Sequence, residues 1–197
     1  MYFNISGVIL AGGKSSRMGV NKAFLTINGE MIITKVVKLM SSLFKSLMII
    51  TNTPEEYKFL HLPTFEDIYK DKGPLGGIHS ALNYSTTEKN FIISCDMPFM
   101  TVEMIEYIIN YNTQKPVVFC KAAGYLQPLA GIYSKSIIPH LKSFLSDENI
   151  TDSCFHQFLK EVDSEIINPE FIPFYRDKIF YNVNSPEDYY KILKGII

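Results

Sequence analysis

Short apolar runs alternate with amphipathic segments along this chain, and this alternation restricts its fold more than any other feature. The runs are three to six residues long, which suits buried strands. They lie at residues 5–10, 47–50, 91–95 and 117–119, and Thr64-Phe65-Glu66 is a further, brief strand that ends at Asp67. Segments with apolar residues at helical spacing lie at 31–43, 74–84, 101–109, 134–145 and from 185 onward. Strands that alternate with helices predict right-handed crossovers and a mainly parallel sheet covered on both faces.

Turn and cap residues refine this outline. Asn28-Gly29 predicts a tight hairpin turn, and Thr53 is placed to cap a short helix that starts at Pro54. The remaining predicted elements are a strand or hairpin partner at 127–133 beside 117–119, a helix at 152–159, strands at 166–167 and 180–183, and a terminal helix opened by Ser185 and Pro186. Gly131 leaves its strand without side-chain bulk at one point.

The bulk composition favours one globular domain. The chain has 197 residues, no linker-like stretch and a formal net charge of −1, so we expect a single domain over residues 1–197. This charge balance gives no reason to expect a nucleic-acid or membrane partner. Three distant cysteines and four scattered histidines suggest neither a disulfide framework nor a zinc site. We therefore expect a cytoplasmic α/β protein, a single-domain Rossmann-like three-layer sandwich with a mainly parallel, mixed central sheet.

The first apolar run leads into a glycine-punctuated stretch, L-A-G-G-K-S-S-R-M-G-V-N-K, at residues 10–22. Its glycines, small hydroxyls and cations do not suit a core, but they suit a loop whose backbone approaches a polyanion. Gly12 and Gly13 can turn sharply and direct amide N–H groups at phosphate oxygens. Arg17 can bind two phosphate oxygens at once, and Lys22 adds a point charge. The stretch predicts a phosphate site, against the alternative of a strand-to-helix turn with solvated charges.

Two familiar phosphate-binding motifs are excluded. A Walker motif needs a glycine five positions before Gly13, and that position is Val8. The dinucleotide fingerprint G-x-G-x-x-G is missing because Gly12 and Gly13 are adjacent. The stretch therefore belongs to a different kind of nucleotide site.

Polar residues follow the ends of four predicted strands. They are Gly12 and Gly13 after the first, Asn52 after the second, Asp67 after the third and Asp96 after the fourth. Because ligands of open α/β sheets bind beyond the carboxyl ends of the strands, we expect these residues in one crevice. The Asp96 carboxylate is a candidate ligand of Mg²⁺, with nucleotide phosphates and water as the other ligands. Thr101 is better placed than Asp96 to cap the next helix.

Five short motifs follow one another along the chain. They are L-A-G-G-x-S-x-R-M-G-x-x-K from Leu10 to Lys22, Asp67 followed by Gly73-Pro74-Leu75-Gly76-Gly77, Cys95-Asp96-Met97-Pro98, Gln127-Pro128-Leu129, and Asn182-Val183-Asn184. Together they resemble the motifs of the nucleotidyltransferases, and the Gly-Gly form of the first is most similar to the molybdenum cofactor guanylyltransferases. The matches run from about Gly7 to Asp188, nearly the whole chain. This resemblance implies a fold of the nucleotide-diphospho-sugar transferase type.

The resemblance implies transfer of GMP from GTP to the phosphate of molybdopterin, with release of pyrophosphate and Mg²⁺ as cofactor. The implied catalytic residues are Arg17, Lys22 and Asp96, with Asp96 as the metal ligand. The implied nucleotide-binding residues are Leu10, Ala11, Gly12, Gly13, Lys22, Asn52, Asp67, Gly76 and Asp96, and the implied acceptor-binding residues are Gln127, Pro128, Asn182 and Asn184. Other cofactor-biosynthesis proteins and acceptor molybdoenzymes are further partners that it suggests, for a monomer or small homo-oligomer.

Several alternatives stay open. Asn21 stands where the family commonly has aspartate, which removes a charge beside Lys22. The asparagine expected after the second strand aligns with Thr51 or Asn52. CTP with the same pterin, or a sugar or polyol phosphate acceptor, is an alternative, although Gly12 favours GTP because cytidylyl relatives tend to have alanine there. A nucleotide-sensing module without turnover is an alternative from another class.

Overall fold

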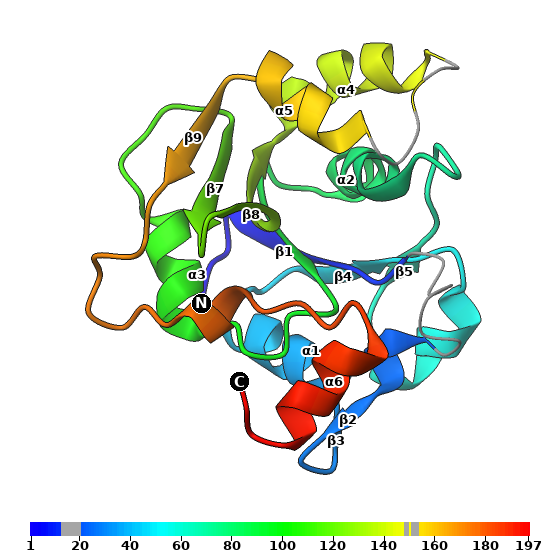
Figure 1. The fold of residues 1–197 in the computed structure, drawn as a ribbon. Helices are drawn as coiled ribbons and strands as arrows, with labels where there is room; N and C mark the ends of the chain where they lie inside the picture. Colours follow the sequence, from blue (N-terminus) through cyan, green and yellow to red (C-terminus); the bar gives the residue numbers. More distant parts are fainter. Residues whose placement is uncertain (13–20, 148–149, 151–153) are drawn as a thin grey trace.

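The computed structural model describes residues 1–12, 21–147, 150 and 154–197, and it is built on one seven-stranded sheet (Figure 1). The strands of this sheet are β1 (Ile5–Leu10), β4 (Leu47–Ile50), β5 (Thr64–Phe65), β6 (Lys89–Ser94), β7 (Val117–Ala122), β8 (Tyr125–Ser134) and β9 (Ser164–Ile167). They are arranged in the order β5-β4-β1-β6-β8-β7-β9. Only β8 runs antiparallel to its neighbours in this sheet. The predicted mainly parallel, mixed sheet is confirmed.

Helices cover both faces of the sheet (Figure 1). The helices of one face are α1 (Ile32–Leu43), α3 (Val102–Ile109) and α6 (Pro186–Leu193); those of the other are α2 (Gly73–Tyr84), α4 (Ile138–Leu145) and α5 (Phe155–Glu161). Strand side chains alternate between the two cores, so that Ile9 packs on the α1 side and Val8 on the α2 side. This is the expected three-layer sandwich. No helix of the described residues is long and apolar enough to span a membrane.

The strand order places a crevice at the ends of β1 and β6. From β1 the chain passes through α1 to β4 and then β5, which extends the sheet in one direction. It then returns through α2 to β6, on the other side of β1. In sheets of this kind the reversal of direction leaves a ligand-binding crevice beyond the carboxyl ends of the two central strands. The site described below lies at that edge.

One predicted turn and one predicted hairpin are confirmed. Asn28 and Gly29 have φ angles of 56° and 79° and join β2 (Thr26–Ile27) to β3 (Glu30–Met31) as a hairpin. In the β7–β8 hairpin, a Cβ on Gly131 would lie 2.5 Å from the carbonyl oxygen of Val118. That contact explains why this strand has no side chain at Gly131.

Two local predictions are wrong. Thr53 does not cap the 3₁₀ helix η2 (Pro54–Leu60) with its side chain, because its hydroxyl lies 3.4 Å from the hydroxyl of Thr51 instead. Residues 180–183 do not form a strand, since Phe180 ends the 3₁₀ helix η5 (Asp177–Phe180) and the following residues join no ladder. Both ends of this segment are buried all the same. The apolar pattern of residues 180–183 predicted their burial correctly, but it did not predict their pairing correctly.

The late helices begin close to their predicted positions. The segment at 152–159 corresponds to α5, which begins at Phe155; residues 151–153 lie outside the described residues. The terminal helix α6 begins with a capping box, in which the Ser185 hydroxyl accepts the Asp188 N–H and the Asp188 carboxylate accepts the Ser185 N–H. The 3₁₀ helices η1 (Lys22–Phe24) and η3 (Lys135–Ile137) complete the elements used below.

Candidate active site

Four neighbouring strands end at one edge of the sheet, and each end presents a residue singled out from the sequence. Along the order β5-β4-β1-β6, these residues are Asp67, Asn52, Gly12 and Asp96. The strands that lead to Asp67 and Asp96, β5 and β6, are three inter-strand spacings apart, about 14 Å. Two acids so far apart do not share one ion. The edge therefore has two polar ends with the exposed Gly12 between them.

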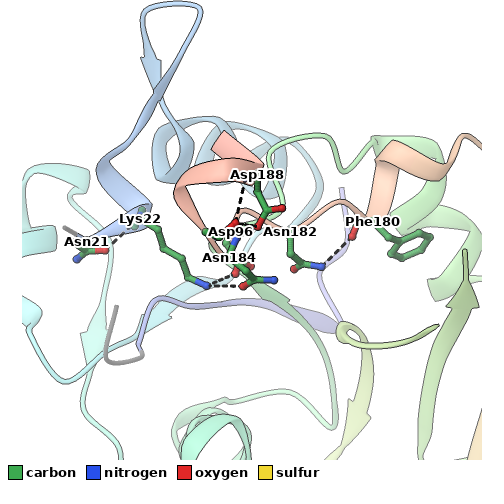
Figure 2. Close-up of polar contacts among 9 residues, drawn as sticks. Asn21, Lys22, Asp96, Phe180, Asn182, Asn184 and Asp188 are labelled. Atoms are coloured by element: carbon green, nitrogen blue, oxygen red, sulfur yellow. Dashed lines mark hydrogen bonds and ion pairs between the residues drawn. The ribbon is translucent and has the colours of Figure 1, made fainter. Parts of the chain in front are cut away.

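Asp96 is the centre of the first end (Figure 2). Its side chain is only 5% exposed, and its Oδ2 forms an ion pair with Nζ of Lys22. The same ammonium group donates to Oδ1 of Asn184 at 3.2 Å. The other carboxylate oxygen of Asp96 is buried without a hydrogen-bond partner within the described part of the chain. A buried acceptor without a partner is uncommon, and it marks a place where a ligand or ion would fit.

Backbone contacts hold this cluster together. The Cys95 N–H donates to the Leu10 carbonyl at 3.0 Å, which joins the ends of β6 and β1. The Val183 N–H donates to the Asp96 carbonyl at 3.1 Å, so the segment before α6 lies against the β6 end. Asn184 thereby reaches Lys22 from a point 162 residues away in the chain.

Asp188 fixes the segment that carries Asn184. Its Oδ2 accepts hydrogen bonds from the N–H groups of Asn184, at 3.0 Å, and Ser185, at 2.8 Å, and its Oδ1 accepts one from the Tyr181 hydroxyl, at 3.0 Å. Burial by itself would raise the pKa of Asp188, but these hydrogen bonds and that from the Ser185 hydroxyl lower it overall. Asp188 therefore stays ionised and holds the turn in place.

The two asparagines of the late motif do not act alike. Figure 2 shows the Asn184 amide directed at Lys22 and the Asn182 amide directed the other way. Nδ2 of Asn182 donates to the Phe180 carbonyl at 2.9 Å. The expectation that both amides project the same way required an extended strand, which does not form. Of the pair, Asn184 is the one that the structure joins to the Lys22–Asp96 cluster.

Asn52 and Asp67 form the second end. Nδ2 of Asn52 donates to Oδ2 of Asp67 at 2.8 Å, and the Asp67 N–H donates to Oδ1 of Asn52 at 3.2 Å. Thr51, the alternative to Asn52, is 1% exposed and hydrogen-bonds locally to Thr53. Within the described residues, Oδ1 of Asp67 is a second buried carboxylate oxygen without a partner. Burial raises the pKa of the Asp67 carboxyl, and the Asn52 hydrogen bond lowers it in part.

The raised pKa of Asp67 leads to a testable prediction. A carboxyl whose pKa is higher in the folded state costs stability as pH rises from its ordinary value near 4 through the folded value. We expect Asp67→Asn to raise the melting temperature of the ligand-free protein at pH 7. The gain should be small, because solvent screens the charge of this partly exposed group. Thermal melts between pH 4 and 8 measure it; a variant less stable than the wild type at pH 7 would contradict it.

The end of β1 is tied into its neighbours. The Ala11 N–H donates to the Ile50 carbonyl at 2.9 Å, and the Ala11 carbonyl accepts a hydrogen bond from the Tyr57 hydroxyl at 3.1 Å. Leu10 is 8% exposed, whereas Gly12 is exposed. The candidate residues Gly13 and Arg17 lie outside the described residues. Of the early motif, the structure therefore places its first three residues and its last two, Asn21 and Lys22.

Asn21 makes one contact that an aspartate could also make and two that need its amide N–H groups. Its Oδ1 accepts the Ala23 N–H at 3.1 Å and so caps η1, which starts at Lys22. Its Nδ2 donates to Oε2 of Glu56 at 2.9 Å and lies 3.1 Å from the Tyr57 hydroxyl. The sequence analysis missed Tyr57. Its one signal was an aromatic residue inside the charged run Glu55-Glu56-Tyr57-Lys58.

Close packing around α2 explains why glycine occurs at positions 76 and 77. A Cβ on Gly76 would lie 2.5 Å from the carbonyl oxygen of Tyr69, closer than any side chain allows. A Cβ on Gly77 would lie 3.3 Å from a methyl of Leu10 and 3.7 Å from Oδ1 of Asp67. Gly76 thus lets the preceding loop approach the helix, while Gly77 is the nearer of the two to the candidate site.

The predicted acceptor residues Gln127 and Pro128 lie near the start of β8. Because β8 is antiparallel to β6 and Ala130 pairs with Ile93, the residues before Ala130 lie toward the Asp96 edge. The Pro128 carbonyl accepts a hydrogen bond from the buried Tyr133 hydroxyl at 2.6 Å, which fixes this part of the strand. Both residues therefore flank the Asp96 end on the side away from Asn52.

The residues around Asp96 fit Mg²⁺ better than a metal held by protein alone. No group of three or more histidine, cysteine, aspartate or glutamate side chains that could hold a metal occurs among the residues for which positions are described. Mg²⁺ typically binds one or two carboxylates together with substrate phosphates and water. A single acid with one unpartnered, buried oxygen suits that coordination.

Comparison with known proteins places this chain among nucleotidyltransferases. The family model described as "MobA-like NTP transferase domain" matches residues 7–163. A protein of Carboxydothermus hydrogenoformans named "Probable molybdenum cofactor guanylyltransferase" is 38% identical over 195 residues, 97% of this chain and 96% of its own length. A protein of Syntrophotalea carbinolica named "Molybdenum cofactor guanylyltransferase" is 31% identical over 192 residues, 94% of this chain and 89% of its own.

Solved structures share the fold. A protein of Aquifex aeolicus superposes with a TM-score of 0.77 at 28% identity, covering 91% of this chain and 93% of its own. The molybdopterin-guanine dinucleotide biosynthesis protein A of Archaeoglobus fulgidus superposes with a TM-score of 0.81 at 20% identity, covering 97% and 98%. At that identity the second match concerns the fold alone. The sheet described above is therefore the sheet of a known architecture.

Proposed function

Because the chain belongs to the MobA-like NTP transferase domain family, we propose that it transfers GMP from GTP to the phosphate of molybdopterin and releases pyrophosphate. The observation that carries this proposal is the cluster of Lys22, Asp96 and Asn184, with its unpartnered carboxylate oxygen, at the sheet's switch point. Relatives that match nearly the full chain are named molybdenum cofactor guanylyltransferases, which supports the choice of substrates.

The two polar ends suggest how GTP would lie. The base would lie toward Asn52 and Asp67, and the phosphates would pass Gly12 toward Lys22 and Asp96. A separation of about 14 Å between the ends, at the ordinary strand spacing, suits an extended nucleoside triphosphate. The acceptor would approach from the β8 side, where Gln127 and Pro128 lie. The stretch with Gly13 and Arg17 would complete the phosphate site.

Asp67 supports GTP over CTP. Guanine presents two neighbouring donors, N1–H and the 2-amino group, to which a carboxylate is complementary. Cytosine presents an acceptor at N3 beside its amino group, and this acceptor would face the carboxylate unfavourably. Oδ1 of Asp67 has no partner among the described residues, and Oδ2 accepts one hydrogen bond from Asn52 and has a second lone pair free, so the carboxylate can still face both guanine donors.

The chemistry is a displacement at phosphorus. An oxygen of the acceptor phosphate forms a bond to the α-phosphorus of GTP, and the bond from that phosphorus to the bridging oxygen of pyrophosphate breaks. The acceptor oxygen is already anionic, so no general base is required. Burial raises the pKa of the adjacent Cys95 thiol to about 12, so it is not a nucleophile at neutral pH. Lys22 would neutralise charge that builds on the phosphates, while Asn184 positions its ammonium group.

We further propose Mg²⁺ as the cofactor, held on the protein side by Asp96. When bound, the ion would supply charge neutralisation on the phosphate oxygens. In the ligand-free protein, the Lys22 ammonium occupies one oxygen of the same carboxylate. A cytoplasmic location and the pterin-handling partners that the resemblance suggests are also part of this proposal.

The test combines turnover with binding. Purified protein, GTP and Mg²⁺ should release pyrophosphate only when a molybdopterin acceptor is added, and CTP should support much less. GTP should raise the melting temperature more than CTP, ATP or UTP at equal concentration, since the best ligand stabilises most by mass action. Stronger stabilisation by CTP would favour the cytidylyl alternative. Binding of GTP without product over hours would favour the sensing module.

A further inference from the structure

The Tyr57 hydroxyl connects two points that lie on either side of the early glycine-rich motif. Tyr57 is fully buried on η2. Its hydroxyl donates to the Ala11 carbonyl at 3.1 Å and accepts from Nδ2 of Asn21 at 3.1 Å. Ala11 is the residue before Gly12, and Asn21 is the residue before Lys22. One side chain from a different part of the chain thus fixes both ends of the stretch expected to bind phosphate.

We propose that Tyr57 is a positioning residue for nucleotide transfer, because its hydroxyl holds Ala11 and Asn21, and through Asn21 the catalytic Lys22, in their working arrangement. This inference rests on the proposed function. It adds a residue that contacts no substrate and acts through hydrogen bonds to the chain.

The direction of each hydrogen bond follows from the groups involved. A tyrosine hydroxyl can donate one hydrogen bond and accept others, whereas a carbonyl can only accept. The hydroxyl proton must therefore point to Ala11, and the hydroxyl oxygen must accept from Asn21. The Asn21 amide has two N–H groups, one for Tyr57 and one for Oε2 of Glu56 at 2.9 Å. Asn21 therefore donates to both Tyr57 and Glu56, and Tyr57 in turn donates to Ala11.

Asn21 transmits this arrangement to Lys22. Its Oδ1 accepts the Ala23 N–H and caps η1, whose first residue is Lys22. Lys22 then reaches across to Asp96 and Asn184. Aspartate at position 21 could still cap η1, but it could donate to neither Tyr57 nor Glu56, and it would place a second negative charge beside Glu56. The amide donors of Asn21 are therefore complementary to the acceptor oxygens of Tyr57 and Glu56.

Ring packing and a raised pKa keep the Tyr57 hydroxyl in place and protonated. The Tyr57 ring lies 5.2 Å from the Phe24 ring, centroid to centroid, and Phe24 belongs to η1. Burial raises the pKa of Tyr57 to about 12, so the hydroxyl keeps its proton at any working pH. A phenylalanine at this position would keep the ring contact and remove only the hydroxyl.

The first test is Tyr57→Phe in the full chain, assayed by pyrophosphate release. We expect kcat/KM for GTP to fall about tenfold, with the KM for the pterin acceptor within twofold of the wild type. The matched control is Tyr2→Phe, which removes a hydroxyl that accepts from the Asn110 amide at 3.0 Å, away from the site. The control should leave both constants within twofold.

The second test asks whether Tyr57 and Asn21 act together. Asn21→Asp should lower kcat/KM for GTP by a similar factor, and the Tyr57→Phe/Asn21→Asp double variant should lose much less than the product of the two factors. Asn21→Asp combined with Glu56→Gln should recover part of the loss, because the glutamine amide can donate to the new carboxylate.

Two results distinguish a failure of this inference from a failure of the proposed function. If the wild type turns over GTP and Tyr57→Phe keeps its kcat/KM for GTP within twofold while its melting temperature falls, Tyr57 is merely structural and this inference alone is overturned. If the wild type binds no nucleoside triphosphate by calorimetry, the proposed function is overturned and the inference with it.

Discussion

Asp96→Asn should lower pyrophosphate release from GTP by about 10³-fold or more, because the proposed metal ligand and one site charge disappear together. Asparagine keeps the shape of the side chain and an oxygen that can still accept from Lys22. The fold and GTP binding in the absence of metal should therefore change little. Initial rates at saturating GTP, acceptor and Mg²⁺ measure the first effect, and calorimetry with GTP in chelator measures the second.

The matched control for Asp96 is Asp163→Asn. Asp163 also pairs with a lysine, Lys115, at 2.5 Å, but it is 63% exposed and precedes β9 at the amino end of the sheet. Exposed pairs of this kind contribute little to stability. The control should keep full activity. An Asp96→Asn enzyme within tenfold of the wild type would show that Asp96 is not the metal ligand.

Much of the site could be predicted because strand ends have a fixed geometry. Once the segments at 5–10, 47–50, 64–66 and 91–95 are read as parallel strands, the residues after them must gather at one edge of the sheet. Asn52, Asp67 and Asp96 lie there for that reason. The pairing of Lys22 with Asp96, across 74 residues, needed the coordinates.

What could not be predicted depends on side-chain direction and on local hydrogen bonds. The pattern at 180–183 indicated burial, but burial does not specify a strand partner, so the direction of Asn182 was wrong. The bond between the Tyr57 hydroxyl and Ala11 joins residues 46 positions apart and has no periodic signal. In the sequence, Asn21 differs from the family's common aspartate only by the loss of a charge. In the folded chain, its amide donates two hydrogen bonds.

Lys22→Met should have two opposite effects, on turnover and on metal binding. Turnover should fall by about 10²–10³-fold, the usual result of removing one preorganised group that stabilises transition-state charge. In the absence of nucleotide, however, the affinity for Mn²⁺, a probe for the proposed Mg²⁺ site, should rise. The wild-type ammonium pairs with Oδ2 of Asp96, so an ion that enters at the open Oδ1 meets a like charge on the same carboxylate and must weaken that pair.

The size of the metal effect follows from the exposure of the lysine. A charge-assisted hydrogen bond contributes about 1.5–3 kcal/mol, and the Lys22 side chain is 22% exposed, so the lower value applies. That value corresponds to about tenfold tighter Mn²⁺ binding. Without metal, the variant should melt at a lower temperature than the wild type, because Asp96 is left as a buried, unpaired charge. Mn²⁺ should restore most of the difference.

Calorimetry and thermal melts with and without Mn²⁺ check both effects, with Lys115→Met as the control. That variant removes a lysine paired to an exposed acid and should change neither turnover nor Mn²⁺ affinity. If Lys22→Met bound Mn²⁺ no more tightly than the wild type, the ammonium and the ion would not compete for Asp96. The lysine would then act on the phosphates alone.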